Sequence, residues 1–216
     1  MKIFSVRSVP STKWSSDKPL NFSPKPITIF ILCLGLFLFG LGESLIITAS
    51  VGMSPWTVLA EGLSITTGLS IGTLTFLISL GVLLLWIPLK QQAGIGTILN
   101  AIIVAAVIEW SLPYLPHPET YAMQILQAVL GTLIVGVASG IYLIANLGPG
   151  PRDGLMTGCQ KATGLPIAWV RVFLEIVVIT IGWILGGTVG IATVIFAIGV
   201  GPAVSMGLYL IASISK

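Results

Sequence analysis

The sequence predicts an all-α integral membrane protein made of two inverted-topology repeats. Each repeat has three transmembrane helices and one short helix that is re-entrant or interfacial. Three observations predict this class: a very apolar composition, an internal duplication, and basic residues confined to alternate connections. The predicted organisation is a basic cytoplasmic leader over residues 1–26 and a single transmembrane domain over residues 27–216. Repeat one covers about 27–112 and repeat two about 121–213.

The composition excludes a soluble domain. Hydrophobic residues make up 55% of the 216 residues and charged residues 8%, with a mean hydropathy of +1.05. Soluble domains carry about 25% charged residues. The ten Lys and Arg residues are scattered over loops, so the pI near 9.0 does not indicate a nucleic-acid-binding surface. A chain of this length holds six or so spans and little else.

The duplication is visible without gaps, because residues 35–110 recur 96 positions later as residues 131–206. Most paired positions are apolar in both copies, and many are identical: Gly52 and Gly148, Pro55 and Pro151, Leu59 and Leu155, Thr67 and Thr163, Gly94 and Gly190. A duplicated apolar unit is typical of membrane proteins built from two structural repeats, many of which are secondary transporters.

Apolar runs predict six spans, at roughly 27–50, 70–88, 93–112, 121–146, 166–185 and 188–213. Each is near or above the ~20 residues that cross a bilayer as a helix. Two further segments, 55–67 and 151–163, are too short to cross. Each opens with Pro and ends before Gly, which are helix start and stop signals.

The positive-inside rule sets the predicted orientation. With the N-terminus in the cytoplasm, all ten basic residues fall on the cytoplasmic side, and the outer connections at 51–69, 111–120 and 186–188 contain none. Both termini are then cytoplasmic, in a bacterial plasma membrane. Trp86 and Trp169 are expected near cytoplasmic ends of spans, and Trp110 and Trp183 near outer ends. Three spans per repeat is an odd number, so the second repeat enters the membrane inverted.

The segment Gly52-Met-Ser-Pro55-Trp56-Thr-Val-Leu59, with Gly62, Thr67-Gly68-Leu69 and Gly94-Ile-Gly96-Thr97, resembles the YczE/YyaS-type and YitT-like bacterial membrane proteins. The second copy repeats the pattern weakly from Gly148 to Leu155. The resemblance implies a multi-pass plasma-membrane protein and no substrate. Many relatives have an acidic residue after Pro-Trp, where this chain has Thr57. Asp153 keeps an acid in the second copy.

The two short helices are the predicted binding site, because paired interrupted segments in two inverted halves mark the midplane site of transporters. Their residues Pro55, Trp56, Thr57, Arg152 and Asp153 are therefore candidates for binding. The alternative is that both helices are interfacial caps.

Charged residues within spans add three more candidates. Arg171 and Glu175 are four residues apart and are expected to form an ion pair on one helix face, more as a structural pair than a proton relay. Glu43 has apolar neighbours in the sequence, and its counterpart in the second repeat is Ser139.

The sequence contains no enzymatic or metal-binding motif, so we expect no catalytic residues, metal or cofactor. The predicted function is transport or permeation of an unidentified small solute. The alternative is a non-transporting accessory protein that acts through protein partners. The expected partners are the lipid bilayer and a small solute. Homo-oligomerisation through glycine faces is an open alternative.

Overall fold

The computed structural model describes residues 10–214, and this part of the chain is helical, with no strand. Its elements in order are α1 Pro26–Thr48, α2 Pro55–Thr67, α3 Ile71–Trp86, α4 Ile95–Ser111, the 3-10 turn η2 Leu112–Tyr114, α5 Tyr121–Ile144, α6 Pro151–Thr163, α7 Ile167–Ile184 and α8 Ile191–Ile214. The predicted short helices 55–67 and 151–163 are confirmed to the residue.

In the described part of the chain, five helical segments are long and apolar enough to cross a membrane: α1, α4 continued by η2, α5, α7 and α8. The predicted second span is shorter than expected, because α3 has only 16 residues and so a length of about 24 Å. It meets the length of a span only together with α2, from which it is bent by 114°. The protein is therefore a multi-pass membrane protein with five or six candidate spans.

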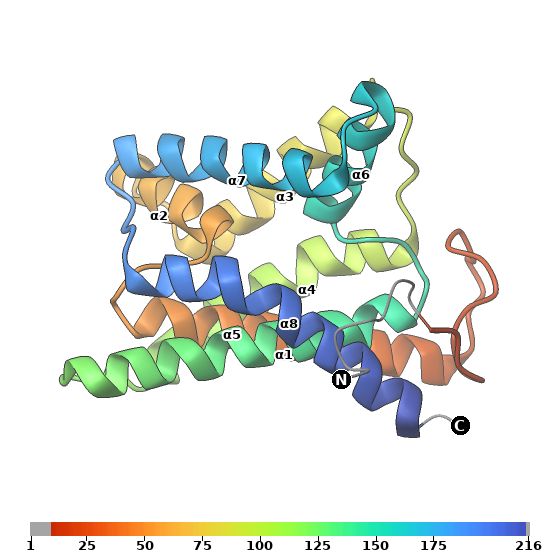
Figure 1. The fold of residues 1–216 in the computed structure, drawn as a ribbon, viewed down its shortest axis with the longest axis horizontal. Coiled ribbons are helices and arrows are strands. Elements are labelled where there is room, and N and C mark those ends of the chain that lie inside the picture. The colour runs from red at the N-terminus through yellow and green to blue at the C-terminus, as the bar shows by residue number, and fades with distance from the viewer. Residues whose placement is uncertain (1–9, 215–216) are drawn as a thin grey trace.

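The helices form two layers that run along the long axis of the molecule (Figure 1). One layer contains α1, α4, α5 and α8, with α1 packed on α4 and α5, and α5 packed on α8. The other contains α2, α3, α6 and α7, with α2 packed on α3 and α7, and α6 beside α3 and α7. Contact between α3 and α4 joins the layers on one side.

Each first helix is followed by the same backbone bend before the short helix. Ser50 and Asn146, which are paired 96 positions apart, have φ of 57° and 53°. Gly52 and Gly148 have φ of 110° and 107°, a region that side chains rarely enter. A Cβ on Gly52 would also lie 2.6 Å from the backbone nitrogen of Gly190. These glycines let the chain turn sharply while another backbone crosses it.

The crossing is reciprocal between the two halves. The Gly96 amide donates to the Leu147 carbonyl at 2.8 Å, and at the paired positions the Ala192 amide donates to the Val51 carbonyl at 3.0 Å. In both cases the first turn of the last helix of one half satisfies a carbonyl in the bend of the other half.

Glycines also set the helix crossings. A Cβ on Gly42 of α1 would lie 2.9 Å from the Gly131 carbonyl oxygen of α5. On the next face of α5, a Cβ on Gly136 would lie 2.1 Å from the Ala203 side chain of α8, and one on Gly140 would lie 2.7 Å from the backbone of Gly207. The spacing from Gly136 to Gly140 thus allows close helix packing, as small residues do in membranes.

The short helices are fastened to α3 and α7 by a large–small pairing that is exchanged between the halves. A Cβ on Gly154 of α6 would lie 1.9 Å from the indole of Trp86 on α3, and this indole donates to the Pro151 carbonyl at 3.0 Å. At the paired positions, Gly182 of α7 packs against the backbone of Val58 on α2. The glycine of the contact is on the short helix α6 in one half and on the longer helix α7 in the other.

This packing corrects one prediction about the aromatic belt. Trp86 is 3% exposed and lies inside the protein, not at a membrane surface. The other three tryptophans named for the belt are largely exposed: Trp110, Trp169 and Trp183.

The described part of the basic leader packs on the body of the protein. The Asn146 side chain donates to the Ser16 carbonyl at 2.8 Å, and the Thr28 hydroxyl donates to the Trp14 carbonyl. Residues 1–9 of the predicted leader lie outside the described residues.

Candidate functional site

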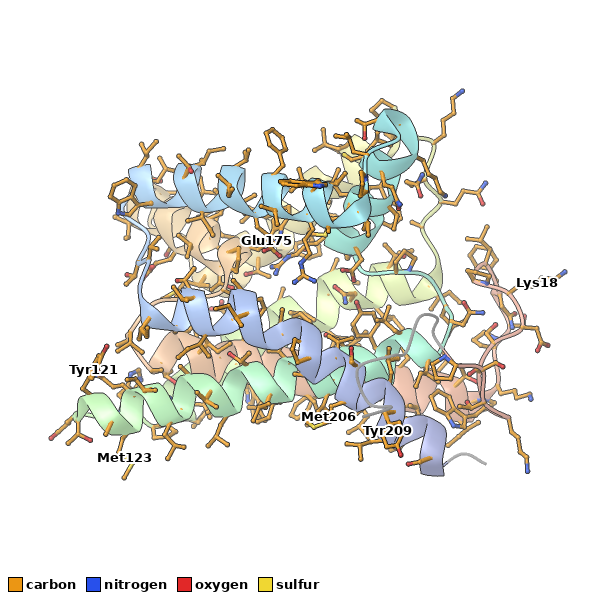
Figure 2. The ribbon with its side chains drawn as sticks, viewed as in Figure 1. Lys18, Tyr121, Met123, Glu175, Met206 and Tyr209 are labelled. Atoms are coloured by element: carbon orange, nitrogen blue, oxygen red, sulfur yellow. The ribbon has the colours of Figure 1, made fainter. Side chains whose placement is uncertain are left out.

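A cavity of about 250 Å³ lies between the two helix layers. Every α-helix contributes to its lining: Phe39, Trp56, Thr75, Ser79, Asn100, Val104, Val135, Ser139, Tyr142, Leu143, Gly150, Pro151, Arg152, Asp153, Met156, Arg171, Glu175, Phe196, Val200 and Val204. Figure 2 shows Glu175 on the side of α7 that faces α8, in the space between the layers.

The lining is amphipathic. The layer of α2, α3, α6 and α7 supplies the charged groups, two arginines and two carboxylates. The layer of α1, α4, α5 and α8 supplies mainly apolar groups, among them Phe39, Val135, Phe196 and Val200. A ligand that fills the cavity therefore meets charge on one side and hydrocarbon on the other.

The first turns of α2 and α6 meet at this cavity. The guanidinium of Arg152 lies over the ring of Trp56, 5.3 Å from its centroid, a cation–π contact. Pro55 and Pro151 occupy the first position of the two helices, where their missing N–H costs nothing. In each half, the bend before the short helix reverses the direction of the chain. The Pro that follows the bend then begins the short helix.

Two buried polar atoms of the lining have no hydrogen-bond partner. They are Nε1 of Trp56, which is 6% exposed, and Oγ1 of Thr75, which is 2% exposed. Buried polar groups are normally paired, so unpaired groups in a cavity wall need an explanation. A bound polar solute or water would satisfy both.

Glu43 lies behind the cavity at the junction of α1 and α2. Its Oε2 is 2.7 Å from the Ser54 hydroxyl and 2.9 Å from the Thr57 hydroxyl. The sequence predicts apolar neighbours for Glu43, and this prediction is wrong, because the bend after α1 brings the hydroxyls of Ser54 and Thr57 back to it. Its Oε1 has no partner.

Two further polar pairs line the cavity. The Tyr142 hydroxyl donates to Oδ2 of Asp153. Nε of Arg171 donates to Oε1 of Glu175 at 2.8 Å, which confirms the expected pairing of these two residues. Among residues 10–214 this is the one ion pair, so Arg152 is not ion-paired.

The structure thus brings the eight candidate residues to one region. Five line the cavity: Trp56, Arg152, Asp153, Arg171 and Glu175. Glu43, Pro55 and Thr57 lie beside it. Sequence reasoning missed Ser54, Tyr142 and Thr75. Ser54 carries the only usable signal, because a hydroxyl residue immediately before Pro marks a helix start; Tyr142 and Thr75 read as ordinary span residues. Within the described residues, no three His, Cys, Asp or Glu side chains gather as metal ligands do.

Residues 26–207 match the family of unknown function DUF6198. The chain belongs to this family. It is 40% identical to an uncharacterized protein of Haemophilus influenzae over 207 residues, covering 96% of this chain and 94% of that protein.

Two Bacillus subtilis proteins are also similar. The uncharacterized membrane protein YczE is 32% identical over 168 residues, covering 76% of this chain and 77% of YczE. The uncharacterized protein YyaS is 26% identical over 167 residues, covering 75% and 83%. These matches confirm the resemblance to YczE and YyaS, and their names state no substrate. No solved structure matches the chain.

Proposed function

We propose that this protein is a bacterial inner-membrane transporter of a small amphipathic anion, built from two inverted repeats that move around the cavity. The observation that carries the proposal is the meeting of two Pro-led short helices, from matching positions of the two halves, at one cavity. In secondary transporters, interrupted helices of inverted repeats place their N-termini at the substrate site in this manner.

The distribution of connections supports the inverted arrangement. The leader, the α3–α4 connection, the far end of α6 and the end of α8 lie at one end of the molecule (Figure 1), and Lys18 marks that end in Figure 2. The α1–α2, α4–α5 and α7–α8 connections lie at the other end and contain no Lys or Arg. By the positive-inside rule the first end is cytoplasmic, with both termini.

One difference between the halves supports a transport cycle. Gly72 of α3 packs against Ala105 and Glu109 of α4, close to the outer end. Its counterpart is Ala168 of α7, and the counterpart of Ala105 is Gly201 of α8. Helices α7 and α8 lack the packing that joins α3 to α4, and a Cβ on Gly201 would meet open space. In the proposed cycle, this arrangement is assigned to a state that is closed outside and open toward the cytoplasm.

The cavity supports a small solute with an anionic group and an apolar part. Its volume of about 250 Å³ lies below the ~300–1,000 Å³ of pockets for drug-sized ligands. Within residues 10–214, Arg152 has no ion pair, and the N–H of Trp56 beside it has no hydrogen-bond partner. An anionic group between them would satisfy both, with its apolar part against Phe196 and Val200.

Thermal unfolding of the purified full chain with small carboxylates tests this function. We expect at least one of benzoate, phenylacetate and the aliphatic carboxylates to raise the unfolding temperature and to enter proteoliposomes. We expect Arg152→Gln to abolish both effects. Lys161→Gln is the control, because Lys161 is exposed at the far end of the same short helix.

Two results would contradict the transporter. In one, no probe stabilises the wild-type chain and crosslinking in cells captures a protein partner, which favours the accessory role. In the other, Arg152→Gln responds to the probes as the wild type does, which removes Arg152 from the site.

A further inference from the structure

The hydroxyl of Thr75 differs from the other buried hydroxyls of the described helices. A serine or threonine inside a helix can donate back to the carbonyl four residues earlier. Ser79 of α3 and Thr132 of α5 do so, each at 2.8 Å. Within residues 10–214, Oγ1 of Thr75 is the one buried hydroxyl oxygen that has no hydrogen-bond partner. Thr75 is 2% exposed and lines the cavity, so its hydroxyl is available to a bound solute.

The two unpartnered groups of the cavity stand where the second half has arginines. Trp56 is paired with Arg152, and Thr75 with Arg171, each 96 positions apart. Arg171 is ion-paired with Glu175, whereas Arg152 has no ion pair in the described part of the chain. The first half therefore gives the cavity neutral hydrogen-bonding groups, and the second half gives it one uncompensated positive charge.

Thr75 and the start of α6 lie at different levels of the cavity. The Trp86 indole, at the end of α3, donates to the Pro151 carbonyl at 3.0 Å and so fixes the first turn of α6 there. Thr75 precedes Trp86 on the same helix by eleven residues, or about 16 Å along its axis. Arg152 directly follows Pro151, and its guanidinium lies over the ring of Trp56. A carboxylate held at the start of α6 therefore leaves Thr75 for a second polar group of the same solute.

The chemistry of the cavity favours a hydroxyl as this second group. The Thr75 side chain offers one hydrogen and two lone pairs. A solute hydroxyl can pair with it as donor or acceptor, whereas a ketone or an ether only accepts. A second carboxylate would have no cation, because Arg152 holds the first and Arg171 is already paired with Glu175. A buried charge without a partner is costly, and a neutral hydroxyl avoids that cost.

We propose that the solute is a hydroxy acid whose hydroxyl lies at the end remote from the carboxylate. The carboxylate accepts hydrogen bonds from Arg152 and from Nε1 of Trp56, and the hydroxyl pairs with Thr75. The apolar middle of the solute lies against Phe196 and Val200. This inference rests on the proposed function, and it adds Thr75 as the residue that determines specificity. Sites that hydrogen-bond a substrate hydroxyl discriminate against the analogue that lacks it.

Isothermal titration calorimetry of the purified full chain with matched acids tests this inference. Phenylacetate has no hydroxyl, mandelate has one beside the carboxylate, and 4-hydroxyphenylacetate has one at the far end. Hexanoate and 6-hydroxyhexanoate form an aliphatic pair. We expect the terminal hydroxyl to tighten binding roughly 3- to 10-fold in each pair, the gain from one net hydrogen bond. Mandelate should bind no more tightly than phenylacetate.

Variants of Thr75 connect this preference to its hydroxyl. Thr75→Val should remove the preference, and Thr75→Ser, which keeps a hydroxyl, should retain it. Thr75→Val breaks no hydrogen bond within the described protein, so we expect it to fold, and its unfolding temperature without solute checks this. Thr132→Val is the matched control, because Thr132 is also 2% exposed but donates to the Ala128 carbonyl and lies outside the cavity lining. It should keep the wild-type preference.

Three results would overturn the hydroxy acid and leave the proposed function standing. The first is equal affinity within both pairs in the wild-type chain, which is expected if only water pairs with Thr75. The second is a preference that survives in Thr75→Val. The third is a Thr75→Val variant that binds parent and hydroxylated acids equally weakly, which would place the carboxylate itself on Thr75. If no acid binds the wild-type chain, this inference and the proposed function both fail.

Discussion

At the scale of single residues, both halves use a glycine where the short helix meets its neighbour, but the glycine is on opposite sides of the contact. Trp86 on α3 lies against Gly154 on α6, whereas Gly182 on α7 lies against Val58 on α2. Each interface pairs one larger residue with one glycine, and which helix carries the larger residue is reversed. A substitution on one side alone leaves either a clash or a void.

This complementarity predicts strong non-additivity. Gly154→Val drives a side chain into the Trp86 indole, and Trp86→Gly leaves a void, so each should cost about 3 kcal/mol or more of stability. The double variant copies the Val58–Gly182 pair of the other half. Unfolding in detergent should therefore show a coupling energy of at least about 1 kcal/mol in favour of the double variant. Strictly additive losses would show that the indole and Gly154 do not determine the packing of α3 on α6.

Some contacts of single residues could be predicted from the sequence, and others could not. The charge of Glu43 in an apolar run was visible, and so was the spacing of Arg171 and Glu175. The partners of Glu43 were not, because Ser54 and Thr57 reach it only through a bend whose direction depends on Gly52. Local spacing reveals contacts within one helix and does not reveal contacts made by a reversal of the chain.

At the scale of elements, the short helices were predictable and the length of α3 was not. Pro and Gly mark both ends of α2 and α6, and these signals are local. The apolar run at 70–88 continues past the end of α3 at Trp86, whose indole donates to the Pro151 carbonyl of α6. Apolarity alone cannot distinguish the end of a helix from the end of a hydrophobic segment.

At this scale we predict that α7 and α8, which lie apart in this structure, pack together in a second conformation. The proposed transport cycle has a second conformation, in which α7 packs on α8 as α3 packs on α4 here. In that conformation Ala168 would lie beside Gly201, as Gly72 lies beside Ala105 in this structure. The double variant Ala168→Cys/Gly201→Cys, in a chain with Cys33 and Cys159 replaced by Ala, should form a disulfide under mild oxidation. Its formation should rise or fall when a transported probe is added, and the oxidised protein should lose flux that reduction restores.

A pair that joins one position of each half serves as control. Gly72→Cys would clash with α4 in this conformation, so the control uses Thr73→Cys/Gly201→Cys, a pair that symmetry does not bring together. Equal crosslinking of both pairs would mean nonspecific collision. No crosslinking of the first pair under any condition would contradict the alternate state.

At the scale of the whole molecule, composition alone predicted a membrane protein, and the duplication predicted matched halves. The paired bends with φ near 110° and the reciprocal amide–carbonyl bonds agree with that expectation at the level of the backbone. The cavity between the layers was not predictable, because it depends on α3 packing on α4 while α7 stays apart from α8. Two repeats of one sequence pattern do not say in which half the last two helices pack together.

The most direct test of the inverted arrangement is labelling of two matched cysteines from the two sides of the membrane. Thr67 and Thr163 are paired positions at the exposed ends of α2 and α6, and each is placed singly as Cys in the chain without Cys33 and Cys159. A membrane-impermeant maleimide should label Thr67→Cys in intact spheroplasts and Thr163→Cys only in inverted vesicles. Labelling of both from the same side would contradict the inverted repeats, and with them the proposed transport cycle.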